Sequence, residues 1–468
     1  MNYSIIAAFC LYAGTLLTIG AYFYRRASHA SAFIVGNRSL GYFVTAIAAQ
    51  SSDMGAWLFL GFPAAVYTKG LTEIWTAVGL VFFMWLTWRF VAPLIRIQTE
   101  QYQSLTLWTY LQRRYNDHHE WLRVGSALLA TYFFLFYIAS GLVALGHIFA
   151  TSFALSYHTG VMLGIGVTTA YILVGGFLAV AWCNVFQGLF LLAMVILVPL
   201  FGWFATDWQS IITNAQLRDV SLTVANSPWS LLSGFALMAG WGLGYFGQPH
   251  IIVNFMSIDD PRKTIYAERI GIAWQIIALT AAISIGFVGI GLYSNLPKPE
   301  LLFNIMSHEL LWPFVTGLAL CGVLAATLSS VNTQLIVAAS AMAEDFYKAV
   351  VAPHAGQLQT TLATRVALIV IALFSTIIAW SDSATIYDSV LYAWSGLGCS
   401  FGPIFLLSLY SNYINKYGAC AAVLVGGVIG ACWPFTAIMP TLVAGFPASI
   451  IAAYYITWLS NKYSTTLA

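Results

Sequence analysis

Apolar stretches of more than 20 residues recur along the whole length of this 468-residue chain. Only 7% of its residues are charged and 60% are hydrophobic, whereas a soluble domain carries about 25% charged residues. A chain with so few charges has to present apolar surface to lipid. The strands of a membrane barrel would be about 10 residues long and would alternate in polarity. The long stretches therefore predict helices, which satisfy their own backbone hydrogen bonds in hydrocarbon.

The sequence predicts an all-α polytopic membrane protein with thirteen membrane-spanning helices. The predicted spans are 4–24, 39–67, 71–95, 123–150, 156–178, 181–205, 230–254, 269–293, 309–343, 362–380, 386–411, 417–437 and 439–460.

The basic residues predict the orientation of these spans. If the N-terminus lies outside, 15 of the 18 Lys and Arg residues fall in loops on one side, and only Lys69, Arg218 and Lys298 fall on the other. Loops rich in Lys and Arg stay in the cytoplasm. We therefore expect an outside N-terminus and a cytoplasmic C-terminus.

Asp53 is a carboxylate inside an apolar span, and its segment contains Gln50, Ser51, Ser52 and Gly55. A lone charge at the centre of a bilayer costs about 2.5–3.5 kcal/mol on insertion scales. The small polar residues around it favour a helix that is interrupted near the middle of the membrane. An interrupted helix frees backbone carbonyls, which coordinate Na⁺ in transporters. The alternative is a carboxylate that faces water at a span end or caps a helix.

A second interruption is predicted at GWGLGYFGQPH, residues 240–250. Glycine weakens a helix, and Pro249 lacks the backbone donor that a helix interior needs. Trp241 and Tyr245 are four residues apart, so they share a helical face and could form the wall of a pocket for a small solute. Close helix packing through small residues is the alternative.

Hydroxyl and amide side chains crowd a third segment, LAATLSSVNTQL, residues 324–335. The adjacent hydroxyls of Ser329 and Ser330 could offer oxygen ligands to a small hard cation. On these residues alone, hydroxyls that bond back to the preceding helical turn are the favoured interpretation.

The two predicted interruptions lie five spans apart, in the second and seventh spans. Interrupted helices in corresponding positions of two halves are typical of transporter binding sites. The sequence therefore predicts two inverted repeats of five helices. The expected divisions are 1–38 for the first helix and its loop, 39–205 and 206–411 for the two repeats, and 412–468 for two C-terminal helices.

Several ordered segments carry a resemblance to a known family. They include GNRSLGYFVTAIAAQSSDMGAWLFLGFPAAVY, GWGLGYFGQPHI, LAATLSSVNTQL, AEDFYK and YAWSGLGCSFGP. In these segments the chain resembles the sodium/solute symporter family, and within it the bacterial sodium/proline symporters. The resemblance implies a LeuT-like core of five plus five helices. It also implies import of L-proline with Na⁺ across the bacterial cytoplasmic (inner) membrane.

The resemblance also implies roles for individual residues. The sodium ligands would be the carbonyls of Ser51, Met54 and Ala326 and the hydroxyls of Ser329 and Ser330. The solute pocket would include Tyr137, Trp241, Tyr245 and Pro249, together with Gly55 and Trp57. Coupling would involve Asp53, Arg38 and the position of Asn184.

Two departures from the family pattern keep alternatives open. Gly55 lies in SDMGAW, where the related symporters usually read SDMSGW, and Asn184 stands where they carry an acidic residue. The first motivates a different small amino acid or organic solute, and the second motivates coupling to H⁺. A sensor that binds solute without transporting it is a third alternative.

The sequence favours transport over catalysis. It contains no HExxH motif, no nucleophile elbow and no paired carboxylates within a span, so we expect no enzyme activity. A net charge of +2 gives no argument for nucleic acid. The expected partners are a small-molecule substrate and membrane lipid, with no obligatory protein partner evident.

Overall fold

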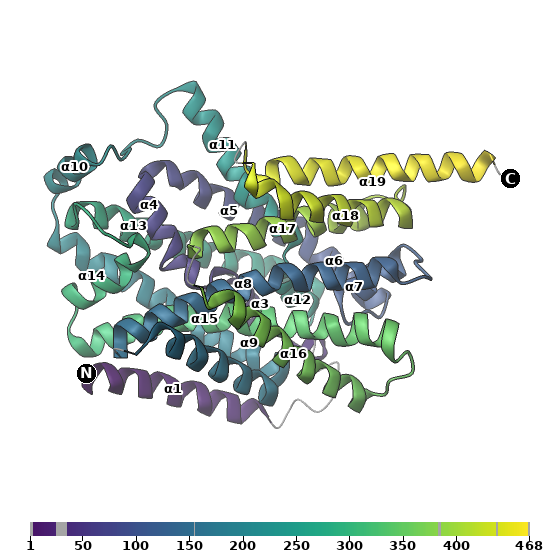
Figure 1. Cartoon of the computed structure of the whole chain (residues 1–468), viewed down its shortest axis with the longest axis horizontal. Coiled ribbons are helices and arrows are strands. Elements are labelled where there is room, and N and C mark those ends of the chain that lie inside the picture. The colour runs from purple at the N-terminus through teal and green to yellow at the C-terminus, as the bar shows by residue number, and fades with distance from the viewer. Residues whose placement is uncertain (1–2, 25–34, 154, 382–384, 437–438, 467–468) are drawn as a thin grey trace.

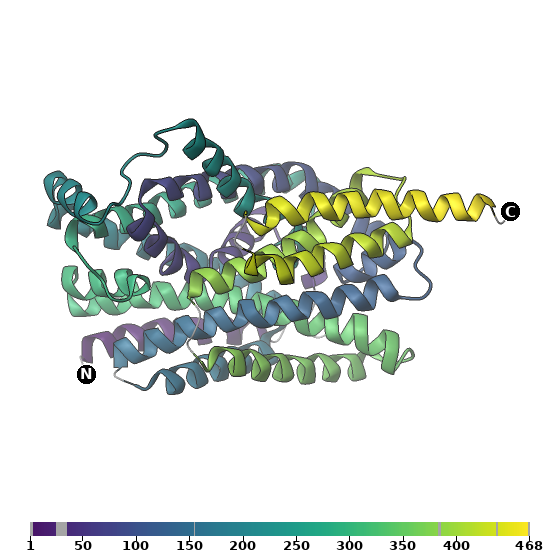
Figure 2. The same ribbon diagram turned by 45° about the horizontal axis from the view of Figure 1, so that its top comes forward.

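The computed structural model describes residues 3–24, 35–153, 155–381, 385–436 and 439–466. Its described residues form helices, and their only extended pairing consists of isolated bridges. The molecule is elongated, and most helices run along its longest axis (Figures 1 and 2). The all-α prediction is therefore confirmed. The loop 25–34, which carries two of the basic residues counted above, lies outside the described residues.

The helices follow one another along the chain without intervening domains. They are α1 (Tyr3–Tyr24), α3 (Tyr42–Met54), α4 (Gly61–Lys69), α5 (Ile74–Leu86), α6 (Ala92–Gln101), α7 (Leu107–Arg114), α8 (Trp121–Phe153), α9 (Tyr157–Ala205), α10 (Trp208–Leu217), α11 (Pro228–Gly242), α12 (Pro249–Met256), α13 (Thr264–Leu292), α14 (Leu302–Leu310), α15 (Pro313–Ser340), α16 (Gln357–Ala379), α17 (Ile386–Tyr410), α18 (Lys416–Cys432) and α19 (Thr441–Thr466).

Nine helices in the described part of the chain are long and apolar enough to cross a membrane. Four of the thirteen predicted spans are not among them. The spans 39–67 and 230–254 are divided by interruptions, 4–24 is a shorter apolar helix, and 156–178 is the first half of α9. The total of thirteen membrane spans stays a prediction. Each of the four spans that is not among the nine has its own local structural reason.

Helix α9 covers two predicted spans in one element of 49 residues. A straight helix of this length would be about 74 Å long, more than twice the thickness of a bilayer core. Gly160 packs against Gly146 of α8, whereas Gly202 packs against Val288 of α13. The two halves therefore contact different partners, and the division of α9 into two spans stays a prediction.

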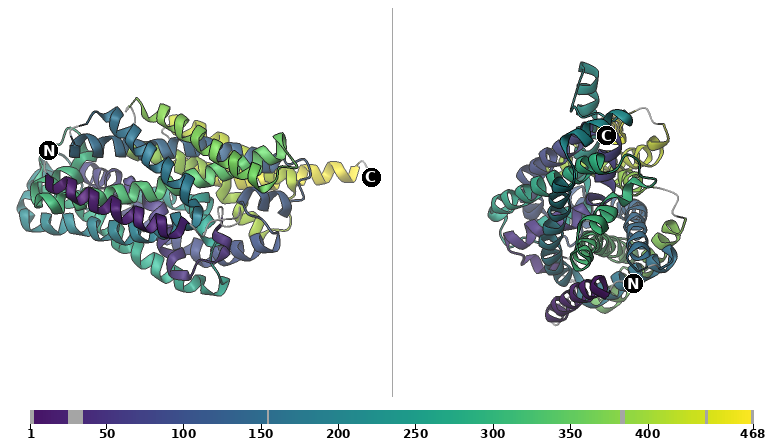
Figure 3. Two further views of the ribbon diagram at one scale, coloured as in Figure 1. Left: turned by 90° about the horizontal axis from the view of Figure 1, so that it is seen from below. Right: turned by 90° about the vertical axis from the view of Figure 1, so that its left-hand side faces the viewer.

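Helix α15 occupies the centre of the bundle. In its most apolar window 83% of the residues are buried, against 33% for α19. It packs against α1, α3, α8 and α9, and the view along the long axis shows the bundle that these helices form (Figure 3). The third segment singled out in the sequence, 324–335, is therefore at the core.

The two interrupted helices run antiparallel to each other. At one end Leu40 N–H donates to Ser257 O at 3.0 Å, and Asp259 N–H donates to Leu40 O at 2.8 Å. At the other end Leu71 N–H donates to Ser221 O at 2.9 Å. Each pairing joins the start of one interrupted helix to the end of the other, as an inverted repeat requires. The domain boundaries given above stay a prediction.

Candidate functional site

The first interruption follows Asp53. Helix α3 ends at Met54, Gly55 has φ 43° and ψ −166°, and the chain resumes in α4 at Gly61. This backbone conformation is essentially restricted to glycine. A Cβ atom at Gly55 would lie 2.9 Å from Ser330 Oγ, so the opened backbone directly faces α15. The predicted interruption is confirmed.

The second interruption separates α11 from α12. Residues Leu243–Gly247 form a short 3-10 segment, and Gln248 is extended before Pro249 begins α12. Proline suits the first turn of a helix because no intrahelical acceptor is available there for a backbone N–H. The Gln248 amide donates to Gly244 O at 3.1 Å and to Trp394 O at 3.0 Å. The first bond satisfies a carbonyl within the interruption, and the second ties the interruption to α17.

Asp53 connects the two interruptions. Its side chain is buried, with 6% exposed, and Tyr245 donates a hydrogen bond of 2.6 Å to Asp53 Oδ2. Gln275 of α13 donates in turn to the Tyr245 hydroxyl at 2.8 Å. Asp53 forms no ion pair with any side chain in the described ranges. The alternative of a carboxylate facing water at a span end is therefore wrong.

Most of the predicted solute-pocket residues line one narrow cavity of about 10 Å³, which is room for about one water-sized sphere. It is enclosed by Asp53, Trp57, Tyr137, Trp241, Tyr245 and Trp394, among others. The rings of Trp57 and Trp241 lie 5.1 Å apart, and the Trp241 indole donates to Tyr387 at 3.2 Å. The cavity is thus closed by aromatic rings, and a solute can enter only when they separate.

Two predicted pocket residues lie elsewhere. Gly55 lines an adjacent narrow cavity of about 10 Å³ with Ser330, and Tyr137 and Trp57 line both cavities. Pro249 lines a third cavity with Val253 and Met256. Since Pro249 comes after the interruption, its ring lies beyond the aromatic wall.

A cluster of neutral oxygens lies between α3 and α15. Ser329 Oγ is 2.7 Å from Ser51 O and 2.9 Å from Ala326 O, and its hydroxyl bonds to both carbonyls. Ser330 bonds back to Thr327 O at 3.1 Å and lines a cavity with Met54. The back-bonding expected of membrane hydroxyls is therefore present, but Ser329 also bridges two helices.

The chemistry of this cluster suits an alkali cation. Hard cations prefer neutral oxygen ligands such as carbonyls and hydroxyls. Among the described residues, no group of three or more His, Cys, Asp or Glu side chains is placed to hold a metal ion. The oxygens between α3 and α15 are therefore the candidate cation ligands.

Asn184 joins this cluster from α9. Its amide donates to Thr333 Oγ1 at 3.0 Å, and Thr333 donates to Ser329 O at 2.9 Å. The position that the resemblance associates with coupling is therefore two hydrogen bonds away from a candidate cation ligand.

Arg38 lies apart from the cavity, in the segment before α3. It donates to Thr99 Oγ1 at 3.1 Å, to Met256 O at 3.0 Å and to Ser104 O at 2.9 Å. Burial, and then the nearby positive charge of Arg96, lower the pKa of Arg38 to about 10. The side chain stays charged at neutral pH and ties the ends of both interrupted helices to the loop after α6.

Three further residues belong to the site but were not predicted from the sequence: Gln275, Trp394 and Tyr387. Gln275 is fully buried in an apolar helix, and a polar side chain in a membrane span is itself a functional signal. The two aromatic residues carried no such signal, because the chain contains 17 Trp and 25 Tyr residues.

Two interrupted antiparallel helices, a closed aromatic cavity and an adjacent oxygen cluster define a secondary transporter of the LeuT-like class. The model of the sodium:solute symporter family matches residues 33–426, and the chain belongs to this family. Membership confirms that it is a multi-pass membrane transporter and that Na⁺ is the coupled cation.

Curated relatives match over nearly the whole chain. The high-affinity proline transporter PutP of Bacillus subtilis is 37% identical, covering 96% of this chain and 97% of its own. The sodium/proline symporter of Escherichia coli K12 is 35% identical, covering 92% of this chain and 87% of its own.

Solved structures support the fold. A Na⁺-coupled sialic acid symporter in a substrate-bound outward-open state matches with a TM-score of 0.82 and 18% identity, covering 98% of each chain. A nucleobase-cation-symport-1 family transporter in a closed conformation matches with a TM-score of 0.55 and 16% identity, covering 93% of this chain and 95% of its own.

Proposed function

We propose that this transporter imports L-proline together with Na⁺ across a bacterial cytoplasmic membrane. The observation that carries the proposal is the bond between Tyr245 and Asp53, which joins both interrupted helices beside the aromatic cavity. Relatives named as proline transporters at 37% and 35% identity support the choice of solute. We expect no catalysed chemical step.

The proposed Na⁺ site is the oxygen cluster between α3 and α15. Its ligands are the carbonyls of Ser51, Met54 and Ala326 and the hydroxyls of Ser329 and Ser330. The C-terminal end of α3 carries a partial negative charge, and buried Asp53 adds a full one close by. A cation here would compensate a carboxylate that has no ion-pair partner in the described ranges.

The proposed solute site is the cavity between Trp57, Tyr137, Trp241 and Tyr245. An imino acid presents a compact apolar ring, which aromatic side chains can surround. Its carboxylate can interact with the N-terminal end of α4 or α12, where backbone N–H groups carry partial positive charge. Its ammonium group can interact with free carbonyls at the opened backbone.

The proposed orientation places the N-terminus outside and the C-terminus in the cytoplasm. Helix α1 begins at one end of the long axis and α19 ends at the other (Figure 1), as an odd number of crossings requires. The concentration of Lys and Arg in one set of loops supports the assignment of the sides.

The test is uptake of radiolabelled proline into proteoliposomes, with an inward Na⁺ gradient against a matched K⁺ gradient. Inward movement of one positive charge gains about 2.3 kcal/mol per 100 mV, which corresponds to a solute accumulation of nearly fiftyfold at about 1.4 kcal/mol per tenfold. We expect accumulation only with Na⁺. Absence of accumulation in correctly inserted protein would contradict the proposal, as would uptake driven by a pH gradient without Na⁺.

A second candidate solute follows from Gly55, which lets the opened backbone approach Ser330 Oγ closely and stands where the related symporters usually carry a serine. This difference beside the cavity could favour another small amino acid or organic solute. Competition of proline uptake by a solute panel decides between them, because the preferred solute competes at the lowest concentration.

A further inference from the structure

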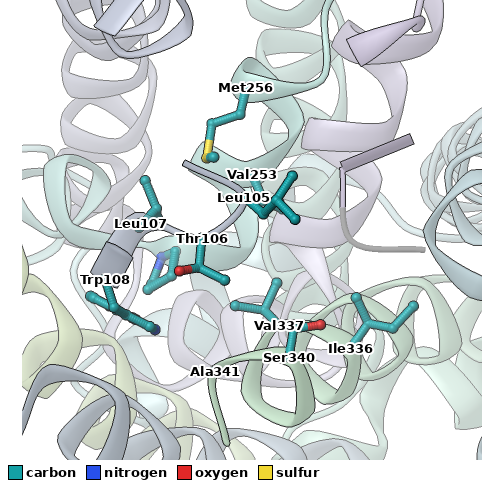
Figure 4. A pocket seen from close by; sticks show the side chains of 11 residues that line it. Leu105, Thr106, Leu107, Trp108, Val253, Met256, Ile336, Val337, Ser340 and Ala341 are labelled. Carbon is teal, nitrogen blue, oxygen red and sulfur yellow. The ribbon is translucent and has the colours of Figure 1, made fainter. Parts of the chain in front are cut away.

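A separate narrow cavity of about 20 Å³ is lined by Pro249 and by residues that follow it in α12 (Figure 4). Val253 and Met256 of α12 face Val337 and Ser340 of α15 across it, and the segment 105–108 closes its side. The cavity begins one residue after the second interruption. It lies toward the end of the molecule that is cytoplasmic in the proposed orientation, which we call the inner end.

The wall formed by segment 105–108 is held by a buried carboxylate. Asp345 is fully buried, and its Oδ1 accepts hydrogen bonds from Thr106 Oγ1 at 2.8 Å, from Thr109 Oγ1 at 2.7 Å and from Arg123 Nε at 2.9 Å. The Arg123 guanidinium also donates to Glu344 O. One carboxylate therefore fixes the start of α7 and the start of α8 to the helix that continues α15.

The helix that carries Asp345 is itself unusual. Residues Ala341–Val351 form a π-helix of 11 residues directly after α15. π-helical turns are rare and occur frequently at functional sites. Ser340 and Ala341, at the junction, line the cavity, so the change of helix type and the cavity meet at one point.

Arg38 holds the residue that directly precedes segment 105–108, because it donates a hydrogen bond to Ser104 O. It also donates to Met256 O at the end of α12. Arg38 belongs to the chain that leads into α3, whereas Asp345 belongs to the continuation of α15. The two attachments differ in strength. Arg38 is half-buried and bonds to neutral acceptors, whereas Asp345 is a fully buried charge in an ion pair, which is costly to separate.

We propose that segment Ser104–Thr109 is the inner gate of the transport path and that Asp345 is its positioning residue. Opening breaks the bonds of Arg38 to Ser104 and Met256, while Asp345 keeps the segment attached to α15. The cavity then connects the solute pocket to the cytoplasm through the space beside α12. The proposal adds to the proposed function a residue outside the solute and Na⁺ sites.

Thiol labelling in inside-out vesicles tests the proposal without depending on the identity of the solute. Ser340→Cys serves as reporter, because Ser340 lines the cavity, is 3% exposed and makes no hydrogen bond through its hydroxyl. The exposed cysteines Cys10 and Cys432 are replaced by serine. The labelling rate with a membrane-impermeant maleimide is measured for each site by mass spectrometry.

Asp345→Asn should raise the labelling rate at position 340 by roughly fivefold or more, because the weakened attachment to α15 lets the segment uncover Ser340 even while the Arg38 bonds are intact. Thr109→Val, which removes one neutral donor and leaves the ion pair, should give a smaller increase. Lys348→Gln is the matched control. It breaks the Lys348–Glu344 pair of 2.7 Å on the same π-helix and should leave the rate unchanged.

Buried Cys321 and Cys399 distinguish gate opening from a general loosening of the fold. Both should stay unlabelled in Asp345→Asn. The proposal is overturned if the rate at position 340 is unchanged in Asp345→Asn and Thr109→Val, if Lys348→Gln raises it equally, or if Cys321 and Cys399 become reactive together with it. If the protein fails to accumulate proline but shows the expected labelling, only the proposed identity of the solute is contradicted, and the gate proposal stands.

Discussion

The hydroxyl of Tyr245 donates a hydrogen bond of 2.6 Å to Asp53, across 192 residues of sequence and between the two interrupted helices. Tyr245 receives a second bond from Gln275, which places Asp53 at the end of a chain of polar groups in an otherwise apolar region. A movement of either interrupted helix must therefore change the environment of the Asp53 carboxylate. This gives a direct physical connection between the solute cavity and the proposed Na⁺ site.

Replacing Tyr245 by Phe should weaken transport. The variant keeps the ring but removes the donor to a buried carboxylate, and an unsatisfied buried group costs about 1–3 kcal/mol, more when it is charged. We expect roughly a tenfold loss in kcat/KM for uptake or in apparent Na⁺ affinity. Initial uptake rates at varied Na⁺ and solute concentrations measure both.

Tyr12→Phe is the matched control for this variant. The Tyr12 hydroxyl is also buried and accepts a hydrogen bond from Gln187 at 3.1 Å, but it lies outside the cavity. Equal effects of the two variants would mean that the Asp53 contact has no special role.

Replacing Ser329 by Ala should weaken Na⁺ binding more than it weakens folding. The change removes the one hydroxyl that bridges Ser51 O and Ala326 O. A hydrogen bond to a charged group contributes about 1.5–3 kcal/mol. If the hydroxyl contributes a comparable free energy to Na⁺ binding, its loss should raise the Na⁺ dissociation constant at least roughly tenfold. Calorimetric Na⁺ titration of purified protein gives this constant directly.

Ser400→Ala provides the comparison, because Ser400 is equally buried and bonds back to Gly396 O in the same manner. Its Na⁺ affinity should match that of the unmodified protein. If Ser329→Ala also leaves Na⁺ binding unchanged, the cation does not bind in the proposed cluster.

Local chemistry was enough to predict the positions of both interruptions. A carboxylate among small polar residues and a run of glycines before Pro249 are features of short segments. The partner of Asp53 could not be predicted in the same way, because Tyr245 reaches it only through the antiparallel packing of the two interrupted helices. The sequence likewise did not predict that Pro249 lines a different cavity from Trp241 and Tyr245, because this depends on how the chain turns after the interruption. The AEDFYK segment gave no sign of a π-helix, since its residues are ordinary helix formers.

Gly55 should not tolerate a side chain in its present surroundings. Its φ of 43° is strained for other residues, and a Cβ atom would lie 2.9 Å from Ser330 Oγ. Gly55→Ser should lower stability by about 1–3 kcal/mol and reduce uptake. The related SDMSGW pattern has its glycine one position later, so Gly55→Ser combined with Ala56→Gly should recover part of the loss.

Thermal unfolding and uptake of the single and double variants measure this recovery. Gly125→Ala is the reference, because a Cβ atom at Gly125 meets nothing within 4 Å. A fully active and stable Gly55→Ser protein would show that the backbone here adapts without the compensating glycine.

Arg38→Gln should impair transport strongly but should change thermal stability only slightly. Burial and Arg96 lower the pKa of Arg38 to about 10, from an unfolded value of about 12.5. The folded state therefore holds its proton less tightly than the unfolded chain. By linkage, stability rises with pH wherever the unfolded state binds more protons. The charged side chain thus carries a cost that is fully present below pH 10 and is relieved between about 10 and 12.5.

At neutral pH, Arg38→Gln removes this electrostatic cost together with the three hydrogen bonds that close the inner end. We expect a melting temperature close to that of the unmodified protein, and solute leak from preloaded proteoliposomes that is faster without a Na⁺ gradient. Arg113→Gln is the comparison, since Arg113 is exposed and bonds only to Tyr102 O and Gln103 O at the surface. A large drop in melting temperature with unchanged leak would assign Arg38 to folding and remove it from the inner gate.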